Sequence, residues 1–218
     1  GKTLLAIEQA KRMAAKGKKV LLLCYNSFLA KKIESEVVRI AYQNSITVDT
    51  VHGFFYENIG KGNFVEEFKV AIEGKEPKEV FNLLYPSYFV KSLVSNNLTK
   101  FDCLVIDEGQ DFLVETIIQA LDLSLKNGFE NGQWYVFYDS NNQGELYHNF
   151  DNILMMKLKK FGAGEYYLDV NCRNTKPIAV QTAVVSGFPM ADALIQRGEK
   201  VRYMWYDDLE HQKKQIEL

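Results

Sequence analysis

Residues 104–112 read Leu-Val-Ile-Asp-Glu-Gly-Gln-Asp-Phe, an apolar run that ends abruptly in acidic side chains. A short, continuous apolar run is typical of a strand that is buried on both faces, so we expect a strand over residues 103–106. Open α/β sheets bind their ligands at the carboxyl ends of parallel strands. The adjacent carboxylates of Asp107 and Glu108 would then lie where one can hold Mg²⁺ and the other can activate a water molecule.

A solvated acidic turn after a strand is the simpler interpretation of a bare Asp-Glu pair. The start of the chain argues against it, because Gly1-Lys2-Thr3 has the ending of a phosphate-binding loop, G-x-x-x-x-G-K-[ST]. In such loops the lysine reaches the β- and γ-phosphates and the hydroxyl binds Mg²⁺. The tripeptide alone is a weak signal. It becomes much stronger when an acidic strand end follows about a hundred residues later.

The composition indicates a globular chain. With 218 residues, of which 47% are hydrophobic, it can bury a sizeable core in one or two domains. No apolar run approaches the roughly 20 residues needed to cross a bilayer, and no signal-peptide pattern is present. The three cysteines, Cys24, Cys103 and Cys172, are far apart and lack zinc-binding spacing. We therefore expect free, buried thiols and a cytoplasmic protein.

Charge is distributed unevenly along the chain, although the net charge is only -2. Residues 1–41 carry a net charge of +6, and residues 101–169 carry a net charge of -8. A basic region facing phosphates and an acidic region facing a metal would produce this division. Solvated helix faces would produce it equally well, so the division alone does not choose between the two interpretations.

Helical patterns alternate with short apolar runs, which is typical of a parallel sheet with helical crossovers. We expect helices over about residues 3–16, 26–41, 114–126, 176–186 and from 207 onward. Strands are expected over about residues 20–24, 45–49, 103–106, 134–138, 166–170 and 201–206. Between about residues 58 and 100, glycines and prolines separate short amphipathic pieces, which indicates a small helical insertion.

Polar residues follow these strands in an order that resembles the motifs of superfamily 1 helicases, the UvrD/Rep-like and RecD-like motor ATPases. Gly1-Lys2-Thr3 resembles the end of motif I (Walker A), and residues 24–27, Cys-Tyr-Asn-Ser, lie at the position of motif Ia. Residues 50–53, Thr-Val-His-Gly, resemble the following Thr-x-His motif. Residues 107–110 resemble motif II (Walker B, D-E-x-Q), residues 139–143 motif III, and residues 171–173 the N-x-R of motif IV. The ordered set covers most of the chain and is far more specific than any single motif.

The resemblance implies an α/β fold, namely the three-layer RecA-like P-loop NTPase fold with a mainly parallel central sheet. Residues 1–164 would form the first motor domain, with its helical insertion at about 58–100, and residues 165–218 would begin the second. The implied cofactors are ATP and Mg²⁺. The implied partner is single-stranded DNA, with RNA as the alternative track and no membrane.

The family mechanism assigns roles to the matching residues. The nucleotide-binding residues would be Gly1, Lys2, Thr3, Asp107 and Asp139, with Thr3 and Asp107 also holding Mg²⁺. The catalytic residues would be Glu108, Gln110, Gln143 and Arg173. Glu108 would deprotonate the attacking water, the two glutamines would sense the γ-phosphate or the water, and Arg173 would act as an arginine finger. Outside the family context, a surface ion pair with Asp169 is the simpler role for Arg173.

Nucleic acid would cross the opposite rim from the nucleotide, on segments that follow the second and third strand ends of the motor domain. The implied contacts are Tyr25, Asn26, Ser27, Thr50, His52 and Phe54, with Tyr147 and His148 as further stacking candidates. Aromatic platforms suit single strands, at about 1–3 kcal/mol per stacked base. Phe54 also fits a core position, and His52 also fits a structural role.

The chain departs from the family pattern in three places. The first strand and the glycine-rich part of the phosphate loop would lie upstream of Gly1. In the third motif, Tyr138 stands where glycine is usual, and Gln143 lies one position further from Asp139 than is usual. The later motifs would lie beyond Leu218. We therefore expect that the 218-residue chain alone does not turn over ATP at the rate of a motor, whereas its parent protein does.

Three alternatives stay open. One is a P-loop ATPase that regulates a fused nuclease or signalling domain without unwinding. Another is a catalytically silent nucleic-acid-binding module, which would bind neither nucleotide nor Mg²⁺. The last is an α/β domain whose motif matches are coincidental.

Overall fold

The computed structural model of the protein describes residues 1–37, 43–96, 100–111, 114–139, 156, 158–187, 189–190 and 192–216. The chain divides into two compact units. The first is Lys2–Gly164, and the second is Glu165–Leu218, with which Gly1 is grouped.

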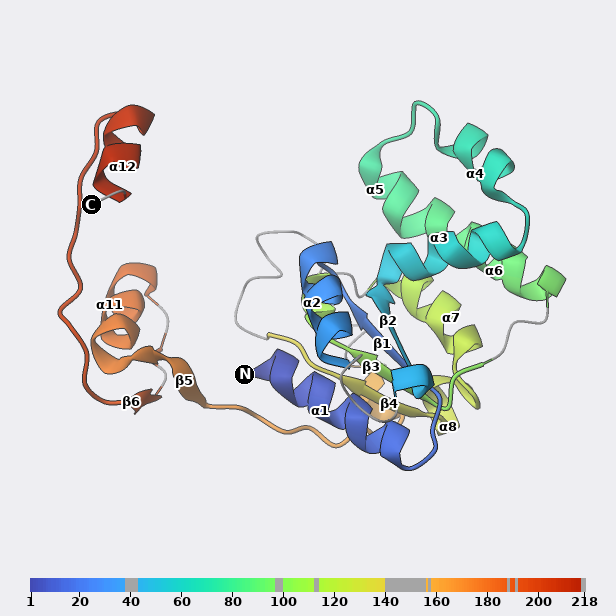
Figure 1. The fold of residues 1–218 in the computed structure, drawn as a ribbon, viewed down its shortest axis with the longest axis horizontal. Coiled ribbons are helices and arrows are strands. Elements are labelled where there is room, and N and C mark those ends of the chain that lie inside the picture. Colours follow the sequence, from blue (N-terminus) through green and yellow to red (C-terminus); the bar gives the residue numbers. More distant parts are fainter. Residues whose placement is uncertain are drawn as a thin grey trace. The chain divides into compact units, whose positions relative to one another are not determined.

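A four-stranded, all-parallel sheet forms the centre of the first unit (Figure 1). Its strands, in spatial order, are β2 (Ile46–Thr50), β1 (Val20–Cys24), β3 (Cys103–Ile106) and β4 (Gln133–Val136). Val20 pairs with both Ile46 and Cys103, and Cys103 pairs with Gln133, so the strands begin level with one another. Their carboxyl ends therefore share one edge. The prediction of an α/β fold with a parallel sheet is confirmed.

Helices cover both faces of this sheet, which explains the continuous apolar runs of β1 and β3. On one face, α1 (Lys2–Ala15) and α2 (Ser27–Val37) pack against Val20, Leu22, Cys24, Cys103 and Val105. On the other face lie α3 (Val51–Lys61), α6 (Tyr85–Asn96), α7 (Glu115–Ser124) and α8 (Gly128–Asn131), packed against Leu21, Leu23, Leu104 and Ile106. Successive strand residues thus alternate between two cores.

The segment between β2 and β3 is helical, and its helices are longer than the sequence pattern indicated. It contains α3, α4 (Val65–Ile72), α5 (Pro77–Glu79), the π-helix η2 (Val80–Leu84) and α6, and the last three follow one another without a break. Phe68 anchors α4, because its side chain is 1% exposed and packs edge-on against Tyr85 and Tyr88 of α6.

The second unit differs from the sequence expectation in its strands. It contains β5 (Val170–Thr175), α11 (Lys176–Ser186), β6 (Asp192–Ile195) and α12 (Leu209–Ile216), with β5 and β6 parallel. The strands expected at residues 166–170 and 201–206 are wrong. Tyr166 and Trp205 give these segments β-propensity, but they are 90% and 83% exposed. Aromatic residues favour a strand only where a neighbouring strand and a core are present to pack against.

The cysteines are all free, as expected, but their burial differs. Cys24 and Cys103 are buried, and burial raises the pKa of both thiols to about 12. Cys172 is exposed on β5, so the prediction of a buried thiol is wrong there. No helix within the described residues is long and apolar enough to cross a membrane.

Candidate functional site

Asp107 lies immediately after β3, and its side chain is completely buried. Its backbone N–H donates to the Leu23 carbonyl at 2.8 Å, which extends the sheet by one residue. Neither carboxylate oxygen accepts a hydrogen bond of normal geometry from the described residues. Burial raises the pKa of Asp107, while the nearby Thr3 hydroxyl and the Lys2 ammonium favour the charged form. A buried carboxylate without donors is rare, and a bound cation is one way to satisfy it.

Glu108 turns the chain sharply after this strand, since its φ of 53° lies in the left-handed region. Non-glycine residues adopt this conformation at a cost of about 1–3 kcal/mol, and such residues cluster at functional sites. The short 3₁₀ helix η3 (Gly109–Asp111) follows.

Gln110 joins the ends of β3 and β4. Its side chain is 1% exposed; Nε2 donates to Glu108 Oε2 at 2.8 Å, and Oε1 accepts from the backbone N–H of Asp139 at 2.9 Å. The Gly109 N–H donates to the Phe137 carbonyl at 2.9 Å, which adds a backbone link between the same strand ends. These contacts hold the Glu108 carboxylate in one orientation.

Lys2 connects the start of α1 to the same edge. Its Nζ lies 2.9 Å from Asp139 Oδ2, and the two side chains are 26% and 31% exposed. A continuous series of contacts therefore runs from Lys2 through Asp139 and Gln110 to Glu108. The structure thus brings together residues that are far apart in the sequence, and Thr3 and Asp107 belong to the same group.

The group can bind phosphate and a hard divalent cation. Lys2 and the N-terminus of the 14-residue helix α1 both favour an anion. Thr3 and Asp107 offer oxygen ligands, which suit Mg²⁺, and Mg²⁺ needs only one or two protein ligands when phosphates and waters complete its shell. No group of three His, Cys, Asp or Glu side chains in the described part of the chain could hold a metal by itself. The residues present therefore fit Mg²⁺ held jointly with phosphate oxygens.

Three of the predicted site residues are not placed in this group. Arg173 belongs to the second unit and lies inside β5, not after a strand. Its side chain is exposed, and among the described residues it forms no ion pair, so the alternative pairing with Asp169 is not observed. Gly1 is exposed and grouped with the second unit. Gln143, like Tyr147 and His148, lies outside the described residues.

Two residues predicted to contact nucleic acid act as helix caps. The Asn26 side chain accepts hydrogen bonds from the Phe28 and Leu29 N–H groups at 2.8 and 3.3 Å at the start of α2. The Thr50 hydroxyl accepts from the Gly53 N–H at 3.0 Å at the start of α3. Capping of this kind stabilises a helix by about 1 kcal/mol and explains both residue types without a ligand.

Phe54 is a core residue, which matches the alternative interpretation given for it. Its ring is 5% exposed and packs against Phe55, Phe89 and Phe101, so most of its surface is covered by the core. The buried residues of α3, Val51, Phe54, Phe55, Asn58 and Ile59, follow the spacing of a helix with one covered face. Helical periodicity outweighs motif position when a large apolar side chain faces a sheet.

His52 makes contacts that match its structural alternative. Nε2 lies 3.1 Å from the Phe81 carbonyl, and the ring packs edge-on against Phe81 and Tyr85. Burial lowers the pKa of His52, which favours the neutral ring. His52 thereby ties the start of α3 to the π-helix.

Tyr25 and Ser27 remain exposed, and sequence reasoning missed their neighbour Phe28, whose side chain is 83% exposed. A signal for Phe28 was present, because it lies off the apolar stripe that Leu29, Ile33 and Val37 form along α2. Exposed Tyr25 and Phe28 thus flank the helix cap at the carboxyl end of β1.

Comparison with known proteins adds no family. No protein-family model matches the chain, and a search of curated proteins finds no significantly similar sequence. The functional assignment therefore depends on the geometry of this site together with the ordered motifs.

Proposed function

We propose that this chain is the first RecA-like motor domain, with the beginning of the second, of a superfamily 1 nucleic-acid-dependent ATPase. The parent protein would couple Mg-ATP hydrolysis to movement along single-stranded DNA. The observation that carries this proposal is the completely buried carboxylate of Asp107, with Thr3 and Lys2 close enough to influence its charge. A P-loop NTPase site needs these three residue types side by side.

Nucleotide binding would begin with an exchange of partners at Lys2. Its ammonium group now neutralises Asp139 across 2.9 Å, and the β- and γ-phosphates would replace that carboxylate. Mg²⁺ held by Thr3 and Asp107 would neutralise further charge on the phosphates. Release of Asp139 from Lys2 would shift Gln110, because Gln110 accepts a hydrogen bond from the Asp139 backbone. Binding at Lys2 is thereby linked to the position of β4.

Hydrolysis would use Glu108 as the general base. Its carboxylate, held by Gln110 at 2.8 Å, would take a proton from a water whose oxygen attacks the γ-phosphorus as ADP leaves. Arg173 would supply the arginine finger from the second unit. Its exposed guanidinium is planar and always charged, which suits the negative charge on the transferred phosphoryl group.

The test is ATP hydrolysis by the intact protein that contains these 218 residues, with and without single-stranded DNA or RNA. Glu108→Gln is expected to lower nucleic-acid-stimulated turnover by about 10²–10⁴-fold, because the general base is lost. Nucleotide binding should remain. Glu115→Gln, on the exposed first turn of α7, is the matched control and should retain activity. Unchanged turnover in the Glu108→Gln variant would contradict the proposed mechanism.

A second candidate is a P-loop ATPase that regulates a fused nuclease or signalling domain without moving on nucleic acid. Burial of Phe54 and the capping roles of Asn26 and Thr50 favour it, since they reduce the contacts available to a strand. Turnover that requires Glu108 but ignores both DNA and RNA would support this second candidate over the motor.

A further inference from the structure

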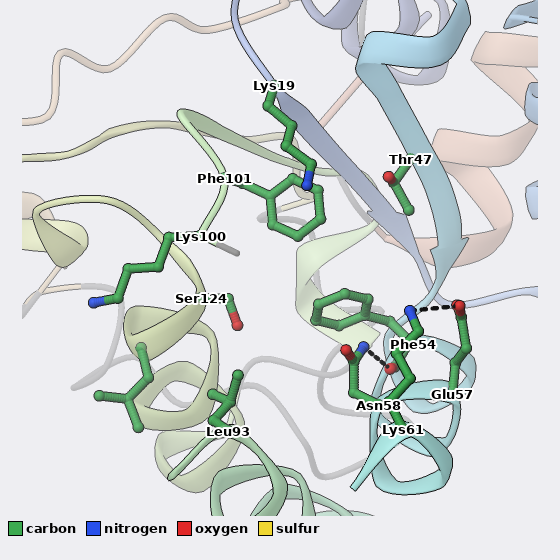
Figure 2. A pocket seen from close by; sticks show the side chains of 11 residues that line it. Lys19, Thr47, Phe54, Glu57, Asn58, Lys61, Leu93, Lys100, Phe101 and Ser124 are labelled. Carbon is green, nitrogen blue, oxygen red and sulfur yellow. Dashed lines mark hydrogen bonds and ion pairs between the residues drawn. The ribbon is translucent and has the colours of Figure 1, made fainter. Parts of the chain in front are cut away.

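A cavity of about 230 Å³ lies at the amino-terminal edge of the sheet, the opposite edge from the candidate nucleotide site. Its lining residues come from the residue before β1, from β2 and α3, from the ends of α6 and α7, and from Lys100 and Phe101 before β3 (Figure 2). The proposed ATPase does not use it. Its floor, walls and mouth differ in chemistry, and each part restricts what can bind there.

Asn58 supplies the floor. Its side chain is 6% exposed, and Nδ2 donates to the Phe54 carbonyl at 2.7 Å. That contact fixes the orientation of the amide, because a carbonyl accepts hydrogen bonds only from the nitrogen. Oδ1 lines the cavity and accepts no hydrogen bond from the described residues (Figure 2). Oδ1 is therefore available to accept a hydrogen bond from a donor on a molecule that occupies the cavity.

The walls are apolar and aromatic. Phe54 and Phe101, which are 5% and 8% exposed, line the cavity together with Leu93 of α6. These three side chains offer apolar contacts to a flat ring. The volume is smaller than the roughly 300 Å³ at which drug-sized ligand pockets begin, which favours one small ring over a fused pair.

The mouth is basic. Lys19, Lys61 and Lys100 line it with a single acid, Glu57, whose carboxylate lies 2.7 Å from Lys61 Nζ. Lys19 Nζ lies 5.1 Å from the centre of the Phe101 ring, a cation–π contact that positions its ammonium group over the wall. Lys19 and Lys100 form no ion pair within the described residues. The mouth therefore attracts an anion.

We propose that this cavity binds a pyrimidine nucleotide. The base N–H would donate to Asn58 Oδ1, the single ring would contact Phe54 and Phe101, and the phosphate would lie between Lys19 and Lys100. A pyrimidine nucleotide combines a donor, a flat ring and an anion in that order along its length. Its source can be free mononucleotide or one unit of a single strand, and the experiment separates the two.

The experiment measures UMP and CMP binding to the 218-residue chain by isothermal titration calorimetry at up to millimolar ligand. The N3-methyl derivative of UMP lacks the only N–H of the uracil ring and should bind about tenfold more weakly, because Asn58 is then left without a donor. AMP, with its fused rings, should bind more weakly than UMP. If neither UMP nor CMP binds, or if N3-methylation has no effect, the proposal is overturned.

Variants on the protein side test the mouth. The double substitution Lys19→Ala and Lys100→Ala should weaken UMP binding about tenfold or more by removing two cations from the mouth. Lys214→Ala, on the exposed helix α12, is the matched control and should bind like the wild type. Equal losses in the control and the double variant would overturn the site. Retention of the fold is checked by the circular dichroism of each variant.

Competition between UMP and an oligouridylate distinguishes a free mononucleotide from one unit of a single strand. If the oligouridylate displaces UMP from the wild-type chain, and this displacement is lost in the Lys19/Lys100 variant, a unit of a single strand enters the cavity. UMP binding without competition by the oligonucleotide would indicate a free mononucleotide. Either result supports pyrimidine nucleotide recognition, and neither depends on Glu108, so the outcome is separate from that of the proposed ATPase.

Discussion

At the scale of single residues, the candidate site depends on side chains that each make two separate contacts. Gln110 holds Glu108 with its nitrogen and the end of β4 with its oxygen. An alanine there would release both partners at once. His52 also has two contacts, since it reaches the Phe81 carbonyl and packs against aromatic rings. Its environment favours the neutral ring, and this gives a pH dependence that can be measured.

The free energy of unfolding should carry a contribution from His52 that is lost in acid. Burial lowers its pKa in the folded state, so between that pKa and the unfolded value of about 6.5 the unfolded chain binds the proton more readily. The contribution is complete above about pH 6.5 and declines as the pH falls through the folded pKa. Urea denaturation at a series of pH values should give a shallower decline for His52→Gln than for the wild type.

Gln119→Ala provides the control, because Gln119 is exposed on α7 and its replacement removes no titratable group. The pH dependence of this variant should follow that of the wild type. Identical slopes for His52→Gln and the wild type would mean that His52 titrates alike in both states, contrary to its observed burial.

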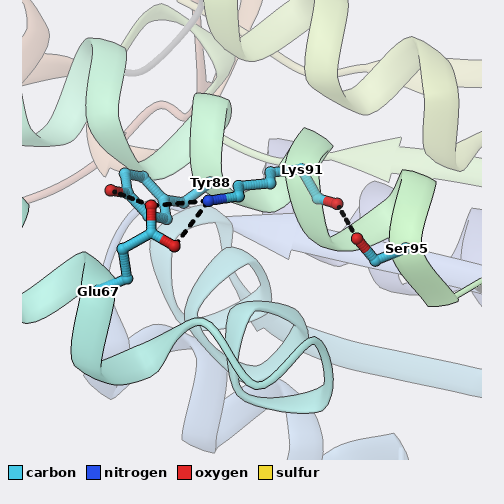
Figure 3. Close-up of polar contacts among 4 residues, drawn as sticks. All are labelled: Glu67, Tyr88, Lys91 and Ser95. Carbon is cyan, nitrogen blue, oxygen red and sulfur yellow. Dashed lines mark hydrogen bonds and ion pairs between the residues drawn. The ribbon is translucent and has the colours of Figure 1, made fainter.

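At the scale of elements, α4 is attached to the rest of the helical segment by few contacts. Lys91 Nζ lies 2.7 and 2.6 Å from the two carboxylate oxygens of Glu67, and Tyr88 OH donates to the same carboxylate at 3.2 Å (Figure 3). These groups are exposed, and exposed ion pairs contribute little to stability. The buried ring of Phe68 must therefore supply most of the attachment.

Phe68→Ala is expected to lower the free energy of unfolding by about 3–5 kcal/mol, the usual cost of deleting a buried ring. Val70→Ala on the same helix should change it by less than about 0.5 kcal/mol, because Val70 is 73% exposed. Chemical denaturation monitored by circular dichroism measures both. A small effect at Phe68 would indicate that α4 unfolds separately from the remaining core.

At the scale of the whole molecule, the two units differ sharply in their cores. Buried apolar side chains are numerous in Lys2–Gly164, whereas the described part of the second unit buries only Ala179 and Ala193 among them. Burial on this scale determines how rarely a segment opens. The first unit is therefore expected to be much the more stable of the two.

Hydrogen exchange measured by mass spectrometry should reflect this difference. Amides of β1 and β3, which are covered on both faces, should exchange slowest in the chain. Amides of β5 should exchange much faster, since all of its residues are exposed or half-buried. Comparable protection of β5 and β1 in the 218-residue chain would contradict the expected order.

The sequence by itself determined the elements whose signal is local. The apolar runs at residues 20–24 and 103–106 predicted β1 and β3 with their observed bounds, and Lys176–Ser186 was predicted as the helix α11. Asp107 and Glu108 were identified from residue type and position alone. These elements were predicted from continuous apolar runs, from helix-breaking glycines and from a Pro near a helix start. Each of these signals is read from adjacent residues, so no long-range information was needed.

Only the tertiary structure decided which residues meet and which are covered. Lys2 pairs with Asp139, and Gln110 bonds to the Asp139 backbone, so both contacts join segments that are remote in the sequence. Phe54 is buried because α3 packs on the sheet. The strand at Val170–Thr175 likewise depends on its partner β6, which local propensity could not indicate. Parallel pairing and burial arise from long-range contacts, and these contacts place the buried acid of residues 104–112 beside Lys2 and Thr3.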